Sequence, residues 1–122
     1  MDLIQNVMAG PGAATPELVQ LQGVHKRHGQ GLAGVHALHD IDLTLAQGEM
    51  VAICGPSGSG KTSLLNIIGM LDTASEGSVI VARLLVSKMS DQARADLRSE
   101  MIGFVFQSYS LIPVMTAHEN VL

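Results

Sequence analysis

The chain has 122 residues, of which 47% are hydrophobic and 15% are charged, and its formal net charge is −4. This length accommodates one domain, and the negative balance without a basic stripe argues against a nucleic-acid partner. No stretch approaches the roughly 18 apolar residues of a membrane span. The single cysteine, Cys54, can form no internal disulfide, so a reducing cytosol is the simplest setting.

The first part of the chain predicts a loose tail followed by two strands. Residues 1–16 carry glycine and proline clusters, and they lack the basic residues of a secretory signal. Strands are expected near 17–26 and 36–46, with a glycine-rich loop at 28–34 between them. In the second strand apolar and polar residues alternate, which predicts a sheet with one solvated face.

A glycine-rich turn stands between two apolar segments. Residues 50–54 predict a strand covered on both faces, and residues 63–68 predict a helix that is buried nearly all round. The turn between them is Gly55-Pro56-Ser57-Gly58-Ser59-Gly60-Lys61-Thr62, which fits G-x-x-x-x-G-K-[ST] at every fixed position. Strand, turn and helix in this order predict a phosphate-binding loop. A turn that merely precedes a helix is the alternative, and four fixed positions disfavour it.

The residue types in this turn suit an oxyanion. Its glycines let the backbone curl with N–H groups pointing inward, and the following helix directs its unpaired N–H groups and positive dipole end at the same anion. Lys61 adds a mobile cation for the outer phosphates. The Thr62 hydroxyl can hold Mg²⁺.

The remaining elements are shorter. Residues 78–86 predict a strand or hairpin, Ser90 predicts the N-cap of a helix, and residues 102–106 predict another apolar strand. Thr116 and Glu119 form a capping box that starts a last helix. Only three residues follow it, so we expect the chain to end inside an element.

Four histidines suggest zinc through two H-x-x-H patterns, formed by His25 with His28 and by His36 with His39. Residues three apart on a strand point to opposite faces. We therefore expect each pair to be poorly placed for chelation, and the four side chains to be exposed or in loops.

From residue 17 to residue 122 the chain resembles the nucleotide-binding subunit of ABC transporters. The segments that carry the resemblance are the strand pair before the loop, the loop itself, the Leu71-Asp72 turn ending at Gly77, Ile102-Gly103-Phe104-Val105-Phe106-Gln107, and Leu111-Ile112-Pro113 followed by Thr116-Ala117-His118-Glu119-Asn120-Val121. Within the family, Met89-Ser90, Leu97-Arg98 and the G-F-V-F-Q pattern are most similar to the group that powers lipoprotein release and macrolide export.

The resemblance implies an α/β fold of the P-loop NTPase type. Residues 17–122 would form the N-terminal part of an ABC ATP-binding domain, with an antiparallel β subdomain and the start of a parallel core sheet. The implied function is Mg-ATP binding by the ATP-binding subunit of a transporter, powering export or lipoprotein release. The implied partners are a transmembrane permease, met by the loop after Gln107, and a second ATP-binding subunit. The implied location is cytoplasmic, peripheral on the inner face of the plasma membrane.

The resemblance also assigns roles to residues. The implied nucleotide-binding residues are His28, Gly55, Pro56, Ser57, Gly58, Ser59, Gly60, Lys61, Thr62 and Ser63. Thr62 and Gln107 would bind Mg²⁺, and Gln107 would be the catalytic glutamine; a plain strand-end amide is the alternative. His28 stands where the family usually stacks an aromatic on adenine, and imidazole offers less stacking area. Thr62-Ser63 reverses the usual order, and Arg83 replaces a common hairpin glycine.

Several family motifs have no counterpart in these residues: the LSGGQ signature, the Walker B aspartate with its neighbouring glutamate, and the switch histidine. Phosphoryl transfer depends on groups that position water and Mg²⁺. We therefore expect the 122 residues to bind nucleotide without ATPase turnover, and to fold poorly around an open apolar edge. The alternative is a truncated, non-hydrolysing remnant or a regulatory nucleotide-binding module at an interface. Another P-loop enzyme is disfavoured, because no Asn-Lys-x-Asp guanine motif is present.

Overall fold

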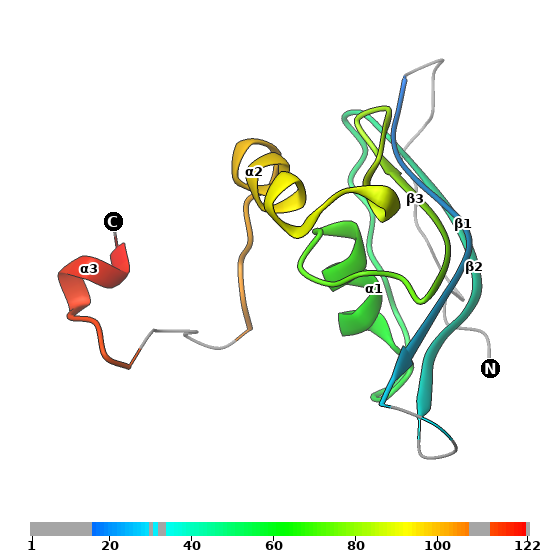
Figure 1. Ribbon diagram of the computed structural model, residues 1–122, viewed down its shortest axis with the longest axis horizontal. Coiled ribbons are helices and arrows are strands. Elements are labelled where there is room, and N and C mark those ends of the chain that lie inside the picture. The colour runs from blue at the N-terminus through cyan, green and yellow to red at the C-terminus, as the bar shows by residue number, and fades with distance from the viewer. Residues whose placement is uncertain (1–15, 30, 32–33, 108–112, 122) are drawn as a thin grey trace.

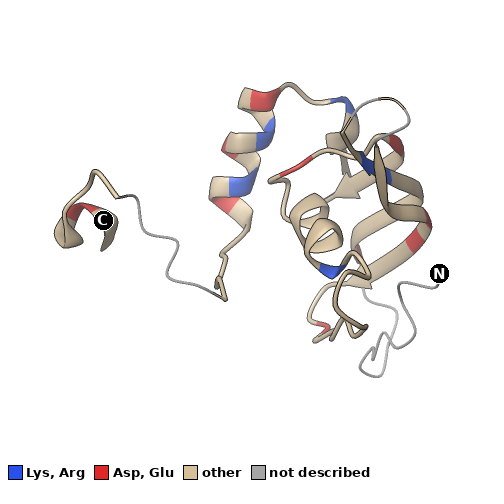
Figure 2. Cartoon of the chain, turned by 90° about the horizontal axis from the view of Figure 1, so that it is seen from below, with Lys and Arg blue, Asp and Glu red and all other residues tan. Residues whose placement is uncertain are grey.

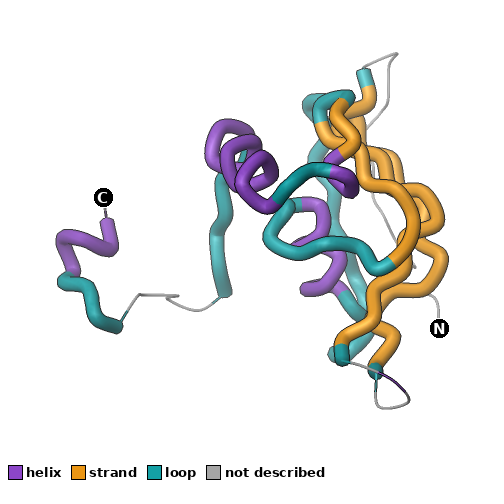
Figure 3. The backbone as a smooth tube through the Cα atoms, viewed as in Figure 1, coloured by secondary structure: helices purple, strands orange, loops and turns teal. Residues whose placement is uncertain are grey.

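The computed structural model describes residues 16–29, 31, 34–107 and 113–121. In chain order its elements are β1 (Glu17–His28), β2 (Val35–Ala46), α1 (Lys61–Ile68), β3 (Glu76–Val81), β4 (Leu84–Leu85), the 3₁₀ helix η2 (Val86–Lys88), α2 (Asp91–Met101) and α3 (Ala117–Val121). The strands form one antiparallel sheet in the order β2-β1-β3-β4. Figures 1 and 3 show this sheet as a curved layer with α1 against one face. The predicted tail lies outside the described residues, apart from Pro16.

The core lies between this sheet and α1. In β2 the predicted alternation is confirmed, because Ile41 and Leu43 are buried while the polar residues beside them are exposed. Leu64 and Ile67 of α1 pack into the same apolar cluster, together with buried residues of β1 and β3. The apolar faces of one sheet and one helix therefore cover each other, and they hold α1 and the loop before it in place.

Both predicted helix starts are confirmed. The Ser90 hydroxyl accepts the Ala93 N–H at 3.2 Å and caps α2. Figure 2 shows both signs of charge along this helix, none of whose residues is buried. At α3, the Thr116 N–H and hydroxyl both donate to the Glu119 carboxylate, and this lowers the pKa of Glu119. In Figure 1, α3 lies apart from the sheet.

Two predicted strands are absent, and one helix is less buried than expected. Residues 50–54 form only an isolated bridge at Ile53, and Met50 is 89% exposed. Residues 102–106 have no regular structure, and Val105 is fully exposed. Apolar runs of this kind form strands when neighbouring strands pair with them on both sides. Among the described residues, the strands β1 to β4 pair only with one another. For the same reason Leu65, on the outer side of α1, is 53% exposed.

The segment after α2 nevertheless packs loosely against α1. The Phe104 ring lies close enough to Gly69 that a Cβ there would approach its Cε1 atom to 2.5 Å. Phe104 also stacks on Phe106, with ring centroids 5.7 Å apart. Leu65 and Ile68 of α1 and the Phe104 ring line an apolar groove of about 350 Å³ on the outer side of the helix. No helix of the described residues combines the length and hydropathy of a membrane span.

Candidate functional site

The turn before α1 has the backbone conformation that its glycines permit. Gly58 has φ of 79° and Gly60 has φ of 94°, both in the left-handed region that other residues adopt only at a cost. The Ser59 N–H donates to the Pro56 carbonyl at 3.1 Å, which closes the curl. A Cβ at Gly58 would meet nothing within 4 Å. Position 58 therefore requires glycine because of its backbone conformation, and the space beside its Cα atom is open.

Lys61 is bound to the loop itself. Its ammonium group donates to the Pro56 carbonyl at 2.9 Å and to the Gly55 carbonyl. The N-cap residue of α1 is Gly60, which has no side chain that could accept hydrogen bonds from the first-turn N–H groups. A cation and an uncapped helix N-terminus thus lie together, and both favour an anion.

A cavity of about 520 Å³ joins the loop to distant segments. Its lining consists of Ser57, Gly58, Gly60, Lys61, Thr62, Ser63, Gln107, Val35, His36 and Ala37. This volume is within the usual range for small-molecule sites. The cavity brings Gln107 to the loop, more than 40 residues away in sequence, together with the beginning of β2.

The other predicted site residues lie around this cavity. Gly55 and Pro56 supply the carbonyls that hold Lys61. Ser59 is buried, and its hydroxyl has no hydrogen-bond partner among the described residues. His28 does not line the cavity, but its Nε2 atom lies 3.1 Å from the Ser63 hydroxyl. The ring predicted to stack on a base is therefore placed beside the loop by a polar contact.

Sequence reasoning missed the part of the wall that β2 supplies, because no nucleotide-binding motif marks Val35, His36 or Ala37. The β1–β2 pairing carries these residues to the loop. A second cavity of about 490 Å³ lies at Pro16 and Arg83 and contains no residue of the motif. The loop cavity is the better candidate because its lining offers hydrogen-bond donors for phosphate and oxygen ligands for Mg²⁺.

An ion pair connects the turn after α1 to β1. Lys26 Nζ lies 3.0 Å from Asp72 Oδ1 and 2.8 Å from the Thr73 carbonyl. Burial raises the pKa of Asp72, but the Lys26 hydrogen bond and the Thr73 N–H outweigh it, so the pKa is lowered overall. Because Lys26 is mostly buried, this pair anchors the end of α1 that lies opposite the loop.

The expectation for the histidines is wrong in two respects. His25 is half-buried within β1. His36 and His39 are exposed, as predicted, but they do not point to opposite faces. Ring nitrogens of His25, His36 and His39 all lie within 4.8 Å of one another. His28 is not part of this group.

The residues around the loop cavity fit a nucleotide with bound Mg²⁺. Two left-handed glycines, an ammonium group and an uncapped helix N-terminus suit the phosphates. The Thr62 hydroxyl and the Gln107 amide oxygen are hard oxygen ligands of the type that Mg²⁺ accepts.

Comparisons with known proteins place this chain in a family. A family model described as ABC transporter matches residues 38–121. Macrolide export ATP-binding/permease protein MacB 1 of Aeromonas hydrophila is 51% identical over 104 residues, which are 85% of this chain and 16% of that protein. Lipoprotein-releasing system ATP-binding protein LolD of Anaeromyxobacter dehalogenans is 49% identical over 115 residues, which are 94% of this chain and 47% of that protein. The chain thus spans half or less of these relatives.

A solved structure shows the same fold. The dimeric ATP-binding cassette MJ0796, in a post-hydrolysis state bound to ADP and Pi, matches with a TM-score of 0.78 at 43% identity. The match covers 85% of this chain and 45% of the cassette, whose sequence comes from Methanocaldococcus jannaschii. The chain therefore belongs to the ABC transporter family and has part of the fold of its ATP-binding domain.

Proposed function

We propose that the chain binds Mg-ATP at residues 55–63, as part of the ATP-binding subunit of an ABC transporter. The observation that carries this proposal is the cavity in which Lys61, Thr62 and Gln107 meet the left-handed glycines of the loop. The size of the cavity and its donors suit a nucleotide with its metal.

Each residue has a distinct part in this proposal. Lys61 exchanges its two backbone carbonyl acceptors for phosphate oxygens, and α1 adds the N–H groups of its first turn. Thr62 and Gln107 hold Mg²⁺, and Gln107 also orients water as the catalytic glutamine. Bound nucleotide supplies the phosphoryl group, while the residues of this chain bind and orient it.

His28 is proposed to stack on the adenine base. Its ring is exposed and sits beside Ser63, so it can offer a face to a base that extends out of the loop cavity. The stacking area of imidazole is small, and we therefore expect a modest contribution to affinity.

The activity of the whole transporter is proposed from its relatives. Their names describe macrolide export and lipoprotein release, so we propose a role in export or lipoprotein release. The partners would be a transmembrane permease, contacted by residues 108–112, and a second ATP-binding subunit, as in the dimeric MJ0796 cassette. The contact segment lies outside the described residues. Such a subunit would work at the cytoplasmic face of the plasma membrane.

The test is binding of a fluorescent ATP analogue in Mg²⁺ buffer by the wild-type chain, Lys61→Ala and Lys88→Ala. Lys88 lies in η2 and outside the cavity lining, so its substitution is the matched loss of one lysine charge. A hydrogen bond to a charged group contributes about 1.5–3 kcal/mol, so Lys61→Ala should bind about 10- to 150-fold more weakly. Equal affinities of all three chains would rule out the assignment of the loop.

A further inference from the structure

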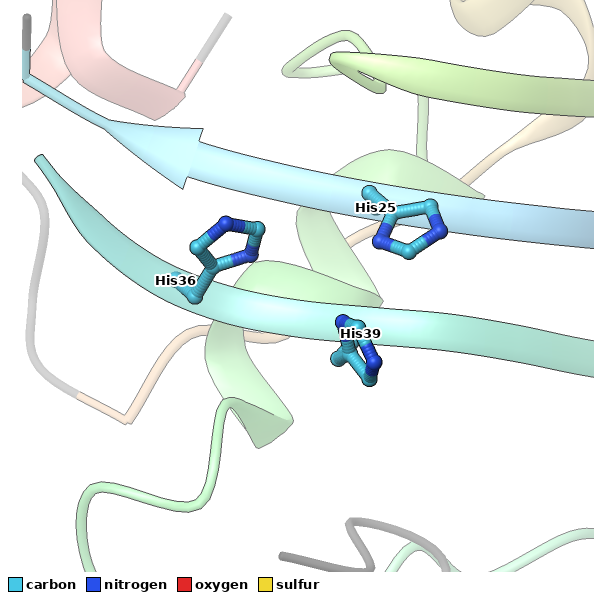
Figure 4. Close-up of side chains that lie close together, drawn as sticks. All are labelled: His25, His36 and His39. Carbon is cyan, nitrogen blue, oxygen red and sulfur yellow. The ribbon is translucent and has the colours of Figure 1, made fainter.

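The three histidines on the β1–β2 ribbon form a cluster outside the nucleotide-binding motif. Figure 4 shows the rings of His25, His36 and His39 on one side of the two strands. The ring centroids are 4.9 Å apart for His25 and His39, 5.9 Å for His36 and His39, and 6.4 Å for His25 and His36. One nitrogen from each ring falls within 4.8 Å of the other two.

The convergence comes from extra residues in β2. Arg27 pairs with His36 and Lys26 pairs with Leu38, so Ala37 is an extra residue opposite a single step of β1. A further shift follows between Lys26 and Val24, next to Asp40 with its φ of 47°. Each bulge interrupts the alternation of side chains by one position. Residues 36 and 39 therefore share a face, and His25 reaches them from the neighbouring strand.

We propose that His25, His36 and His39 bind a borderline transition-metal dication of the Zn²⁺ type. Three imidazole nitrogens and one open position for water match a common arrangement for zinc, and imidazole also suits copper and nickel but not Mg²⁺. The site is therefore different in chemistry from the proposed magnesium site in the loop.

The movement that coordination requires is small. Zinc binds imidazole nitrogen at about 2.0–2.1 Å in tetrahedral geometry, so ligand nitrogens end about 3.4 Å apart. The separation in the cluster, at most 4.8 Å, closes by side-chain rotation, because His36 and His39 are exposed. The Asp40 N–H donates to His25 Nδ1 at a long 3.4 Å. Coordination by His25 would give up this hydrogen bond, which is weak at that distance.

Charges of both signs lie near the cluster. Asp40 follows His39 and Glu76 pairs with His25, and both are negative, whereas Arg27 pairs with His36 across the strands and is positive. The ligand set, not the local field, therefore carries the proposal. His36 also lines the loop cavity. Binding is accordingly measured without nucleotide, whose phosphates would themselves chelate the metal.

The experiment is a Zn²⁺ titration of the 122-residue chain in competition with a chromophoric chelator. We expect one ion per chain, and at least about a 10- to 100-fold loss of affinity in His36→Gln and in His39→Gln, since even outer-shell partners contribute that much. His118→Gln, in α3, removes a histidine outside the cluster and should leave the affinity unchanged. Wild-type-like affinity in both cluster variants, or no stoichiometric binding by the wild type, would overturn the proposal.

A second measurement needs no variant. The chain has five histidines, and ring ¹⁵N signals of the wild type can be followed as Zn²⁺ is added. Three histidines should change together, and the other two, His28 and His118, should not. Uniform small changes in all five would mean scattered surface binding and would also overturn the proposal.

Discussion

The contact between Gly77 and β1 allows a stability prediction that separates two physical effects. Gly77 is the second residue of β3 and has φ of 91°, and a Cβ there would lie 2.3 Å from the Gly23 carbonyl oxygen and 2.7 Å from that of Gln22. Gly48 has φ of 83°, but a Cβ there would meet nothing within 4 Å. Gly48→Ala therefore introduces backbone strain alone, whereas Gly77→Ala introduces strain and a collision with backbone.

The magnitudes follow from this difference. Left-handed backbone costs a residue with a Cβ roughly 1–2 kcal/mol, and both variants share that loss. A Cβ atom essentially never lies closer than 3.0 Å to another heavy atom of this kind, so Gly77→Ala must also move β3 away from β1. Overpacking of this kind costs typically about 1–3 kcal/mol. We expect losses of about 1–2 kcal/mol for Gly48→Ala and about 2–5 kcal/mol for Gly77→Ala.

The assay is urea unfolding followed by far-UV circular dichroism, with the midpoint difference multiplied by a common slope. At this chain length each kcal/mol also lowers the melting temperature by about 3–5 °C. If Gly77→Ala were no less stable than Gly48→Ala, the close approach of β3 to β1 would be wrong. The variant should also disturb His25, which pairs with Glu76 beside the contact.

Three further outcomes are expected. His28→Tyr should bind the ATP analogue about two- to fivefold more tightly, which is the scale of an aromatic pair. Unchanged affinity would mean that adenine does not stack on residue 28. Asp72→Asn should lose about 1 kcal/mol at neutral pH. Because folding lowers the pKa of Asp72 from 3.8, its carboxylate stabilises the fold fully above that pH, and this stabilisation is lost as the pH falls through the lower pKa of the folded state. The urea midpoint of the wild type should therefore fall in acid, and that of Asp72→Asn should not fall for this reason. An identical acid decline of the midpoint in both chains would refute the ion pair. The 122-residue chain should bind a hydrophobic dye, and the Val105→Ser variant should bind less of it. The chain should release no more phosphate from ATP than Lys61→Ala does, and phosphate release that depends on Lys61 would contradict this.

Features set by neighbours in sequence were predictable. The alternation in β2 and the caps at Ser90 and Thr116 depend on local spacing and hydrogen bonding, and all three predictions are confirmed. The strand predicted at 50–54 depends on partners elsewhere in a sheet. An apolar run shows that burial would be favourable, but it does not show which strand provides the burial.

The site divides in the same way. The motif predicts the curl around Gly58, and the structure has it. The wall that His36 contributes depends on strand pairing. The histidine cluster was missed because period-two reasoning assumes an unbroken strand. The residues at the break, from His36 to Asp40, include no glycine, so the sequence carries no clear signal of a bulge there.

The hydrogen bonds of Lys61 to its own loop change how nucleotide affinity should be interpreted. Its ammonium already has two carbonyl acceptors, from Gly55 and Pro56, so an arriving phosphate displaces existing partners. Binding is then an exchange reaction, and its enthalpy should be smaller than a count of new contacts suggests. The same carbonyls keep the ligand-free loop curled around its cation. The nucleotide accordingly meets a preformed cradle, and the conformational entropy of shaping that cradle is lost during folding and not during binding.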